Sequence, residues 1–175
     1  RNVAMVYQQF INYPSMTVAD NIASPLKLRG EQGIAQRVQE LAEKLHIEPF
    51  LKRLPAELSG GERSRVALAR VLAVEAPVIL ADEPTASLDP RHQIDVMKGL
   101  RAAADGGVLV IVVTHDLGLA ARFADHVLVL AQGRLVSQGP PTEALSEAVM
   151  ADVFRISAYR AEYQREAVIV PWAER

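Results

Sequence analysis

The sequence predicts an α/β fold, in which helices cover both faces of a mostly parallel sheet and an all-helical lobe is inserted into the sheet's connections. From Ser59 onward, strand-like and helix-like segments alternate. The strand-like segments are continuous apolar runs, as is typical of parallel strands that are buried on both faces. Before Ser59 the patterns are almost entirely helical. We therefore expect an α/β core at about 1–13 and 76–140, a helical lobe at about 14–75 that includes the helix after Ser59, and a C-terminal helical tail at about 141–175.

Apolar periodicity and cap residues predict the individual elements. An apolar run at 2–7 predicts the first strand, and Thr17 followed by Asp20 predicts the start of a helix. Apolar residues at helical spacing predict an amphipathic helix at about 34–46. The expected later elements are, in order, a helix from about 60, a strand at 78–81, a helix at 90–104, a strand at 108–113, a helix at 117–123, and strands at 127–130 and 134–137.

The composition restricts the class of protein. A chain of 175 residues that is 50% hydrophobic can bury one sizeable core. The formal net charge of -2 argues against a protein dedicated to nucleic acid or to an anionic lipid surface. The absence of Cys excludes disulfides and thiolate metal sites, and it is compatible with a reducing compartment. Because no apolar run approaches the roughly 18 to 20 residues of a membrane span, we expect a soluble or at most peripheral protein.

Two adjacent carboxylates, Asp82 and Glu83, follow the apolar run 78–81. In open α/β sheets, ligands bind at the carboxyl ends of the strands. Asp82 is expected to hold Mg²⁺ there, directly or through water, because this cation prefers carboxylate oxygens and keeps several waters. Glu83 is expected to orient or deprotonate an attacking water. Taken alone, the two residues would also fit a strand that simply ends in a turn.

A Ser-Gly-Gly segment, Ser59-Gly60-Gly61, opens the next predicted helix. Two glycines let the backbone approach an anion closely, and the free N-H groups of the first helical turn complete an anion site. An ordinary N-cap would explain Ser59 alone. It explains the paired glycines less well, because Gly lowers helix stability.

Three more polar residues lie where they can take part in the same chemistry. His115 follows the strand at 108–113, where it can bind a terminal phosphate and hold Glu83 and water in line. Gln8, after the first strand, can reach Mg²⁺ or the attacking water through its amide oxygen. Asp89 either caps a helix that begins at Pro90 or works at an interface. Each has an ordinary structural alternative, and no function is expected of the remaining histidines, His46, His92 and His126.

Together these segments resemble the motifs of the ATP-binding subunits of ABC transporters. The correspondences, in chain order, are Gln8 with the Q-loop, Leu58 to Glu62 with the signature motif, Leu80 to Thr85 with the Walker B strand, Ser87 to Asp89 with the D-loop, and Thr114 to Asp116 with the H-loop. The resemblance covers residues 8–116 and continues to about Gly139. One difference is Glu62, where the family most often has Gln.

The resemblance implies a P-loop NTPase-like fold that lacks its N-terminal β-subdomain and its P-loop. The phosphate-binding pattern G-x-x-x-x-G-K-S/T occurs nowhere in the 175 residues. The sequence also starts at Arg1, directly before a strand-like run. We therefore expect a nucleotide-binding domain truncated before the Q-loop, which by family hydrolyses ATP but as this polypeptide alone is inactive.

The resemblance further implies ATP and Mg²⁺ as cofactors and two kinds of protein partner. In a head-to-tail dimer with a second ATP-binding subunit, the signature residues would act on the partner's nucleotide, while Asp89 would couple the two sites. Transmembrane permease subunits would contact the region from Gln8 to Pro14 and the helical lobe, at the cytoplasmic face of the inner membrane. The residues expected to act in the signature motif are Ser59, Gly60, Gly61 and Glu62, and those expected to act on the subunit's own nucleotide are Gln8, Asp82, Glu83 and His115.

The transporter branch stays open from the sequence. Val6 to Pro14 is similar to carbohydrate importers, whereas Leu80 to His92 and the segment from Gly139 to Pro171 are similar to importers of iron chelates, haem or cobalamin. The longer stretch favours the second branch. Two alternatives to a transporter subunit are a non-transport ABC-type ATPase and a catalytically silent fragment.

Overall fold

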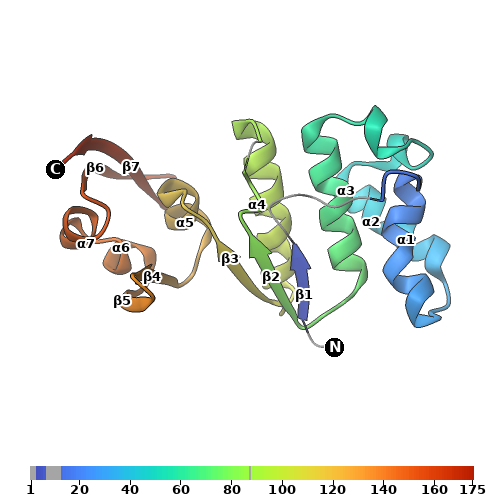
Figure 1. Cartoon of the computed structure of the whole chain (residues 1–175), viewed down its shortest axis with the longest axis horizontal. Coiled ribbons are helices and arrows are strands. Elements are labelled where there is room, and N and C mark those ends of the chain that lie inside the picture. Colours follow the sequence, from blue (N-terminus) through green and yellow to red (C-terminus); the bar gives the residue numbers. More distant parts are fainter. Residues whose placement is uncertain (1–2, 7–12, 87) are drawn as a thin grey trace. The chain divides into compact units, whose positions relative to one another are not determined.

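The structure, a computed structural model, describes residues 3–6, 13–86 and 88–175 (Figure 1). The chain divides into two compact units, Arg1–Val113 and Thr114–Arg175. This division falls inside the expected α/β core at 76–140, so strands that the sequence assigned to one core belong to different units.

The first unit is built on a three-stranded parallel sheet in the order β1-β2-β3. The central strand, β2, carries the two carboxylates at its end. Asp82, its last residue, pairs with Val113 of β3. The parallel sheet expected from the sequence is therefore confirmed, with strands β1 (Val3–Val6), β2 (Val78–Asp82) and β3 (Leu109–Val113).

In the described part of the first unit, four α-helices and two short 3₁₀ turns accompany the sheet. As expected, Thr17 caps the first helix, since its Oγ1 accepts a hydrogen bond of 3.2 Å from Asp20 N. Helix α1 ends at Gly30, whose φ of 67° is readily adopted by glycine. The helices are α1 (Val18–Arg29), α2 (Ile34–Leu45), α3 (Gly60–Ala73) and α4 (Pro90–Asp105), and the 3₁₀ turns are Glu48–Phe50 and Pro55–Glu57.

The buried amide of Asn21 fixes the segment that leads into α1. Its Oδ1 accepts a hydrogen bond of 2.7 Å from Tyr13 N, and its Nδ2 lies 3.1 Å from Tyr13 O. The same nitrogen lies 3.0 Å from the carbonyl oxygens of Met16 and Thr17. One fully buried side chain thus holds the backbone from Tyr13 to Thr17 against the helix.

The two faces of the parallel sheet differ in the described residues. One face is buried and includes Ala4, Val6, Ile79 and Ala81, and helices α3 and α4 contact strands β1 and β3. The other face leaves five large apolar side chains exposed by 42 to 58%, namely Val3, Met5, Leu109, Ile111 and Val113. The sequence predicted helices on both faces, because continuous apolar runs indicate strands buried on both sides. The described helices of this unit cover only one.

The second unit has two antiparallel hairpins and three short helices around a small core. The core contains the buried residues Ala121, Val129, Leu145, Met150 and Ile169. The elements are α5 (Leu117–Phe123), β4 (Val127–Ala131), β5 (Arg134–Gly139), α6 (Pro141–Ala144), α7 (Glu147–Asp152), β6 (Ile156–Tyr163) and β7 (Glu166–Glu174).

The expected C-terminal helical tail is wrong beyond Asp152. Residues 141–152 are helical in part, but β6 and β7 form a hairpin whose register pairs Tyr163 with Glu166. The two residues between them, Gln164 and Arg165, have φ values of 53° and 65°. Two consecutive positive values are typical of a type I′ turn, which normally contains Asn or Gly. The usual sequence mark of a tight hairpin is therefore missing here.

Candidate functional site

The carboxyl edge of the parallel sheet brings several of the expected residues to one end of the first unit. In Figure 1, strands β1 and β2 end at the same edge at which helix α4 begins. Asp82 is exposed at this edge. Glu83 N donates a hydrogen bond of 2.9 Å to Val113 O, which extends the pairing of β2 with β3 by one residue. The backbone of the sheet thus fixes the positions of the two residues that carry the carboxylates.

Glu83 has a backbone conformation that is uncommon for a residue with a side chain. Its φ is 46°, in the left-handed region. The conformation is held on both sides, because Glu83 N is bonded to β3 and Ala86 N donates to Glu83 O at 3.1 Å. The following residues, Pro84 and Thr85, are buried. A conformation of this kind costs about 1 to 3 kcal/mol, and such residues are enriched at functional sites.

The start of α3 is exposed at Ser59 and Gly60. Ser59 is the N-cap, and its Oγ accepts a hydrogen bond of 3.3 Å from Glu62 N, while Ser59 N donates to Glu62 Oε2 at 2.6 Å. The N-cap alternative for Ser59 is therefore present. A hydroxyl that accepts such a bond can still donate its own proton, so the cap is compatible with an anion contact. Ser59 and Gly60 are exposed, and a methyl group at Gly60 would meet no described atom within 4 Å.

Glu62 and Ser59 form a capping box, because the side chain of each accepts a hydrogen bond from the backbone N-H of the other. The hydrogen bond from Ser59 N to its carboxylate holds the pKa of Glu62 below the ordinary value of 4.5, against an opposing effect of burial. A lowered pKa stabilises the folded state when the pH is above the ordinary pKa. This stabilisation is lost as the pH falls through the lowered pKa. A negative charge in the first helical turn also interacts favourably with the helix dipole.

Glu62→Gln is expected to remove this pH-dependent part of the stability. Gln keeps an acceptor for Ser59 N but has no charge. The free energy of unfolding of the variant should therefore be lower by about 0.3 to 1 kcal/mol near neutral pH. The difference between the two proteins should shrink as the pH falls from 7 to below 4. Urea unfolding of both proteins across this range measures it. A difference that stays constant with pH would contradict the role of the charge.

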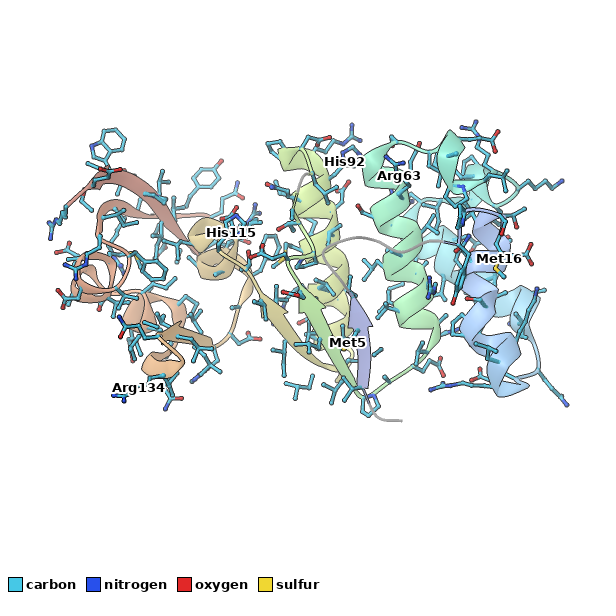
Figure 2. The ribbon with its side chains drawn as sticks, viewed as in Figure 1. Met5, Met16, Arg63, His92, His115 and Arg134 are labelled. Carbon is cyan, nitrogen blue, oxygen red and sulfur yellow. The ribbon has the colours of Figure 1, made fainter. Side chains whose placement is uncertain are left out.

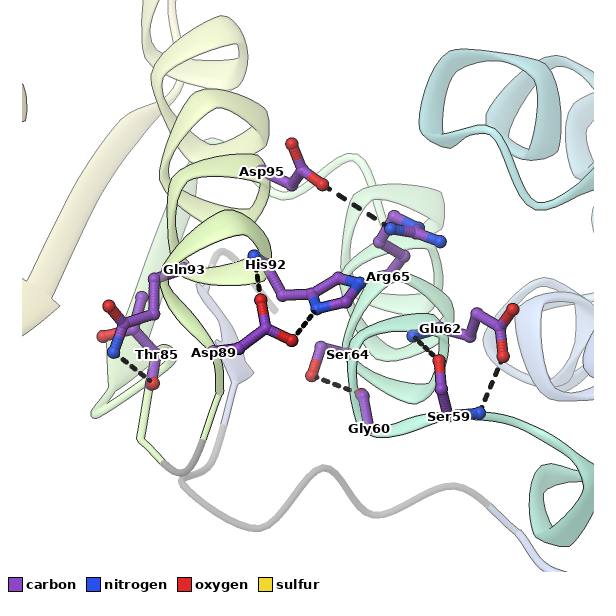
Figure 3. A network of polar contacts seen from close by, with 10 residues as sticks. All are labelled: Ser59, Gly60, Glu62, Ser64, Arg65, Thr85, Asp89, His92, Gln93 and Asp95. Carbon is purple, nitrogen blue, oxygen red and sulfur yellow. Dashed lines mark hydrogen bonds and ion pairs between the residues drawn. The ribbon is translucent and has the colours of Figure 1, made fainter.

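Gly61 lies under the imidazole ring of His92 from α4. A methyl group built on Gly61 would overlap three ring atoms of His92. The ring is also held by Asp89, since His92 Nδ1 lies 2.5 Å from Asp89 Oδ2 and His92 N donates to Asp89 Oδ1 at 3.1 Å. Figure 3 shows the Asp89 pair beside the start of α3. These hydrogen bonds from His92, the side-chain bond first, lower the pKa of Asp89.

His92 is the functional candidate that the sequence reasoning missed, although a signal was present. An N-cap Asp followed by His at the third helical position predicts the local bond between them. The contact with Gly61 could not be predicted, because it joins segments 31 residues apart. Gly61 consequently has a packing reason to lack a side chain, whereas Gly60 is the glycine with open space for an anion.

Helices α3 and α4 stay in contact beyond this point. Arg65 Nη1 lies 3.6 Å from Asp95 Oδ2, and a methyl group on Gly99 would lie 2.6 Å from Leu68 Cδ2. The contacts advance along both helices in the same direction, so the helices run parallel. Figure 2 shows His92 at the N-terminal end of α4, close to the end of α3 that carries Arg63. Gln93 adds a bond of 3.4 Å from its Nε2 to Thr85 O, in the turn after β2.

Two other expected residues, Gln8 and His115, lie outside the described part of the first unit. Gln8 lies outside the described residues. His115 is exposed in the second unit, next to Asp116, whose Oδ1 caps α5 through Leu119 N at 2.9 Å. The alignment of His115 with Glu83 stays a prediction, since the two residues belong to different units.

Tyr13 and Pro14 are the described residues of the segment from Gln8 to Pro14, which is expected to contact the permease together with the helical lobe. Tyr13 is 40% exposed, and the Arg70 guanidinium lies 4.6 Å from the centroid of its ring. Beside it, a groove runs between β1 and the helical lobe. Its walls beyond β1 are formed by Tyr13, Pro25, Ala67, Arg70, Val71 and Val74.

The described residues contain no group of three His, Asp or Glu side chains that could hold a metal by themselves. Asp82 is instead a single exposed carboxylate at the sheet edge. This donor fits Mg²⁺ bound to a nucleotide, because such a Mg²⁺ takes only one or two ligands from protein and the rest from phosphate and water.

Comparison with known proteins agrees with the motifs. Residues 1–86 match the family model described as ABC transporter. The trehalose/maltose import ATP-binding protein MalK of Thermococcus litoralis is 44% identical over 146 residues, which are 82% of this chain and 39% of the relative. The hemin import ATP-binding protein HmuV of Streptomyces coelicolor is 48% identical over 117 residues, which are 67% of this chain and 42% of the relative.

A solved structure extends the likeness to the fold. It is a dimeric post-hydrolysis state of the ATP-binding cassette MJ0796 bound to ADP and Pi, with a TM-score of 0.70 and 33% identity over 80% of this chain and 63% of the other. The chain belongs to the family of ABC transporter ATP-binding proteins. It spans between 37 and 64% of the length of its curated relatives.

Proposed function

We propose that this chain is the part of an ABC transporter ATP-binding subunit that activates water and closes on a partner's nucleotide, so that ATP hydrolysis powers import. The observation that carries the proposal is the pair Asp82 and Glu83 at the carboxyl edge of a parallel sheet, with the exposed start of α3 in the same unit. The similarity of the chain to the ATP-binding subunits of importers supports the transport role.

Within the subunit's own site, Asp82 would hold Mg²⁺ and Glu83 would accept a proton from water. When bound, Mg²⁺ supplies positive charge that neutralises the phosphate oxygens. The backbone bond from Glu83 N to Val113 O fixes the start of the carboxylate side chain, which favours a reproducible distance to the water. His115 and Gln8 would assist by holding the terminal phosphate, the metal and the water.

The start of α3 would serve the second nucleotide of a head-to-tail dimer. Exposed Ser59 and Gly60 offer a hydroxyl and a glycine backbone open to close approach at the positive end of a helix dipole, which favours a phosphate. The dimeric ABC structure with similar sequence supports this arrangement. Asp89, the N-cap residue of the neighbouring helix α4, would connect the two sites.

The permease contact would lie along the groove between β1 and the helical lobe and at the exposed side chain of Tyr13. The described helices include none long and apolar enough to cross a membrane. From the similarity to importer ATP-binding subunits, the membrane crossing would belong to permease subunits, and this chain would attach peripherally at the cytoplasmic face. The substrate branch is a proposal as well, and the longer sequence similarity favours iron chelates, haem or cobalamin.

The proposal is tested by supplying the phosphate-binding loop. We expect no saturable ATP binding by the purified 175 residues at millimolar nucleotide, because the N-H cradle and Lys of a P-loop provide most contacts to a triphosphate. A version joined to an upstream P-loop segment should bind ATP and hydrolyse it. Equilibrium binding of a fluorescent nucleotide and phosphate release measure the two properties.

Two outcomes would contradict these expectations. Saturable binding with turnover by the 175 residues alone would overturn the need for a P-loop segment. A version that carries the P-loop, folds and binds ATP but shows no turnover would overturn the proposed hydrolytic role.

A further inference from the structure

Among the described residues, the side chain of His92 connects Asp89 of the D-loop with the signature helix, and it is held on two sides. The imidazole of His92 covers Gly61 in the first turn of α3, and its Nδ1 bonds to Asp89. A carboxylate can only accept, so Nδ1 is the donor in this bond. The ring is three-quarters buried, with 24% of the side chain exposed, although both of its partners belong to segments at the surface.

Two further described contacts between α3 and α4 lie at a greater distance from the site. Arg65 and Asp95 form an ion pair one turn along, and Leu68 packs over Gly99 one turn further. These contacts join the bodies of the two helices. Of the described contacts, that of His92 is the one that reaches both Asp89 and the Ser-Gly-Gly segment.

We propose that His92 is a positioning residue that locks the D-loop to the first turn of the signature helix, so that Asp89 and Ser59 to Gly61 move as one body. The consequence for the dimer rests on the proposed function. Both locked segments would face the partner's nucleotide, and a shift of either one would carry the other. His92 would act through Asp89 and the first turn of α3, not by contact with the nucleotide.

The lock can be measured without ATP, through a double-mutant cycle between Gly61 and His92 in the version that carries a P-loop. Gly61→Ala should lower the free energy of unfolding when His92 is present, because the new methyl group displaces the ring from Asp89. In a His92→Ala background the same change should be stabilising, since Ala forms helix better than Gly. Gly60→Ala is the matched control and should have the same sign in both backgrounds, because its methyl group has open space.

The functional part is measured by ATP hydrolysis in the same version. His92→Ala should lower kcat about tenfold with KM for ATP within about twofold, because the P-loop holds the bound substrate and the lock acts on dimer closure. His92→Asn should restore a large part of kcat, since its amide N-H can replace Nδ1 in the bond to Asp89. His126→Ala, at an exposed histidine of the second unit, should leave both constants unchanged.

The outcomes separate this inference from the proposed function. A Gly61→Ala effect of equal size and sign in both backgrounds would overturn the lock, as would unchanged kcat in His92→Ala or equal losses in the Ala and Asn variants. If the parent protein does not hydrolyse ATP, the proposed function fails, while the unfolding cycle still decides whether His92 joins the two segments.

Discussion

Replacing Glu83 with Gln is expected to lower ATP turnover at least about 100-fold while ATP binding persists, in the version that carries a P-loop. The amide has nearly the same shape as the carboxylate but cannot accept a proton from water. The backbone that fixes the side chain, with Glu83 N bonded to Val113 O, does not depend on the carboxylate. Phosphate release gives kcat, and equilibrium binding of a fluorescent nucleotide gives Kd.

A matched control is the same chemical change at Glu162, an exposed residue of β6. Glu162→Gln should alter neither turnover nor binding. Near-normal turnover in Glu83→Gln would exclude Glu83 as the base. Loss of ATP binding together with turnover would instead assign Glu83 to holding the nucleotide.

Ser59→Arg is expected to reduce hydrolysis by more than about tenfold by preventing the dimer from closing. Ser59 is exposed at the start of α3, where the proposed arrangement brings the partner's nucleotide against a small side chain and open backbone. A long guanidinium side chain would occupy that space. The change also removes the cap on Glu62 N, which by itself costs about 1 kcal/mol.

Two controls separate the steric effect from the loss of the cap. Ser146→Arg makes the identical change at the N-cap of α7, where Ser146 Oγ accepts from Val149 N. It should reduce stability and leave ATP-dependent dimerisation intact. Ser59→Ala removes the cap without adding bulk, and it should be milder than Ser59→Arg. Size-exclusion chromatography with ATP, in a Glu83→Gln background, measures closure of the dimer. Unchanged ATP hydrolysis in Ser59→Arg would exclude the role of Ser59 at the partner's nucleotide.

Local sequence signals were sufficient for most of the fold. The strand and helix expectations agree with the described elements up to β5 because those segments combine clear periodicity with cap residues, as at Thr17, Ser59 and Asp116. The parallel pairing of β2 with β3 follows from their continuous apolar character and from the helix between them. The adjacent position of Asp82 and Glu83 at the sheet edge follows from the same pattern.

What the sequence did not reveal depends on contacts or conformations without a local signature. The β6 and β7 hairpin turns at Gln164 and Arg165, which are poor indicators of positive φ. The contact of His92 with Gly61 arises only when α3 packs beside α4. The exposed face of the sheet reflects which helices the described chain provides, and strand sequences do not carry that information.

Because Glu83 has a left-handed backbone conformation, folding stability and catalytic activity favour different residues at this position. Glycine would adopt a φ of 46° without steric strain, so Glu83→Gly would relieve a cost of about 1 to 3 kcal/mol if the turn stayed intact. The same change would delete the carboxylate on which the proposed reaction depends. Screens that select variants of this protein for heat resistance alone would therefore tend to drift toward inactive sequences at residue 83.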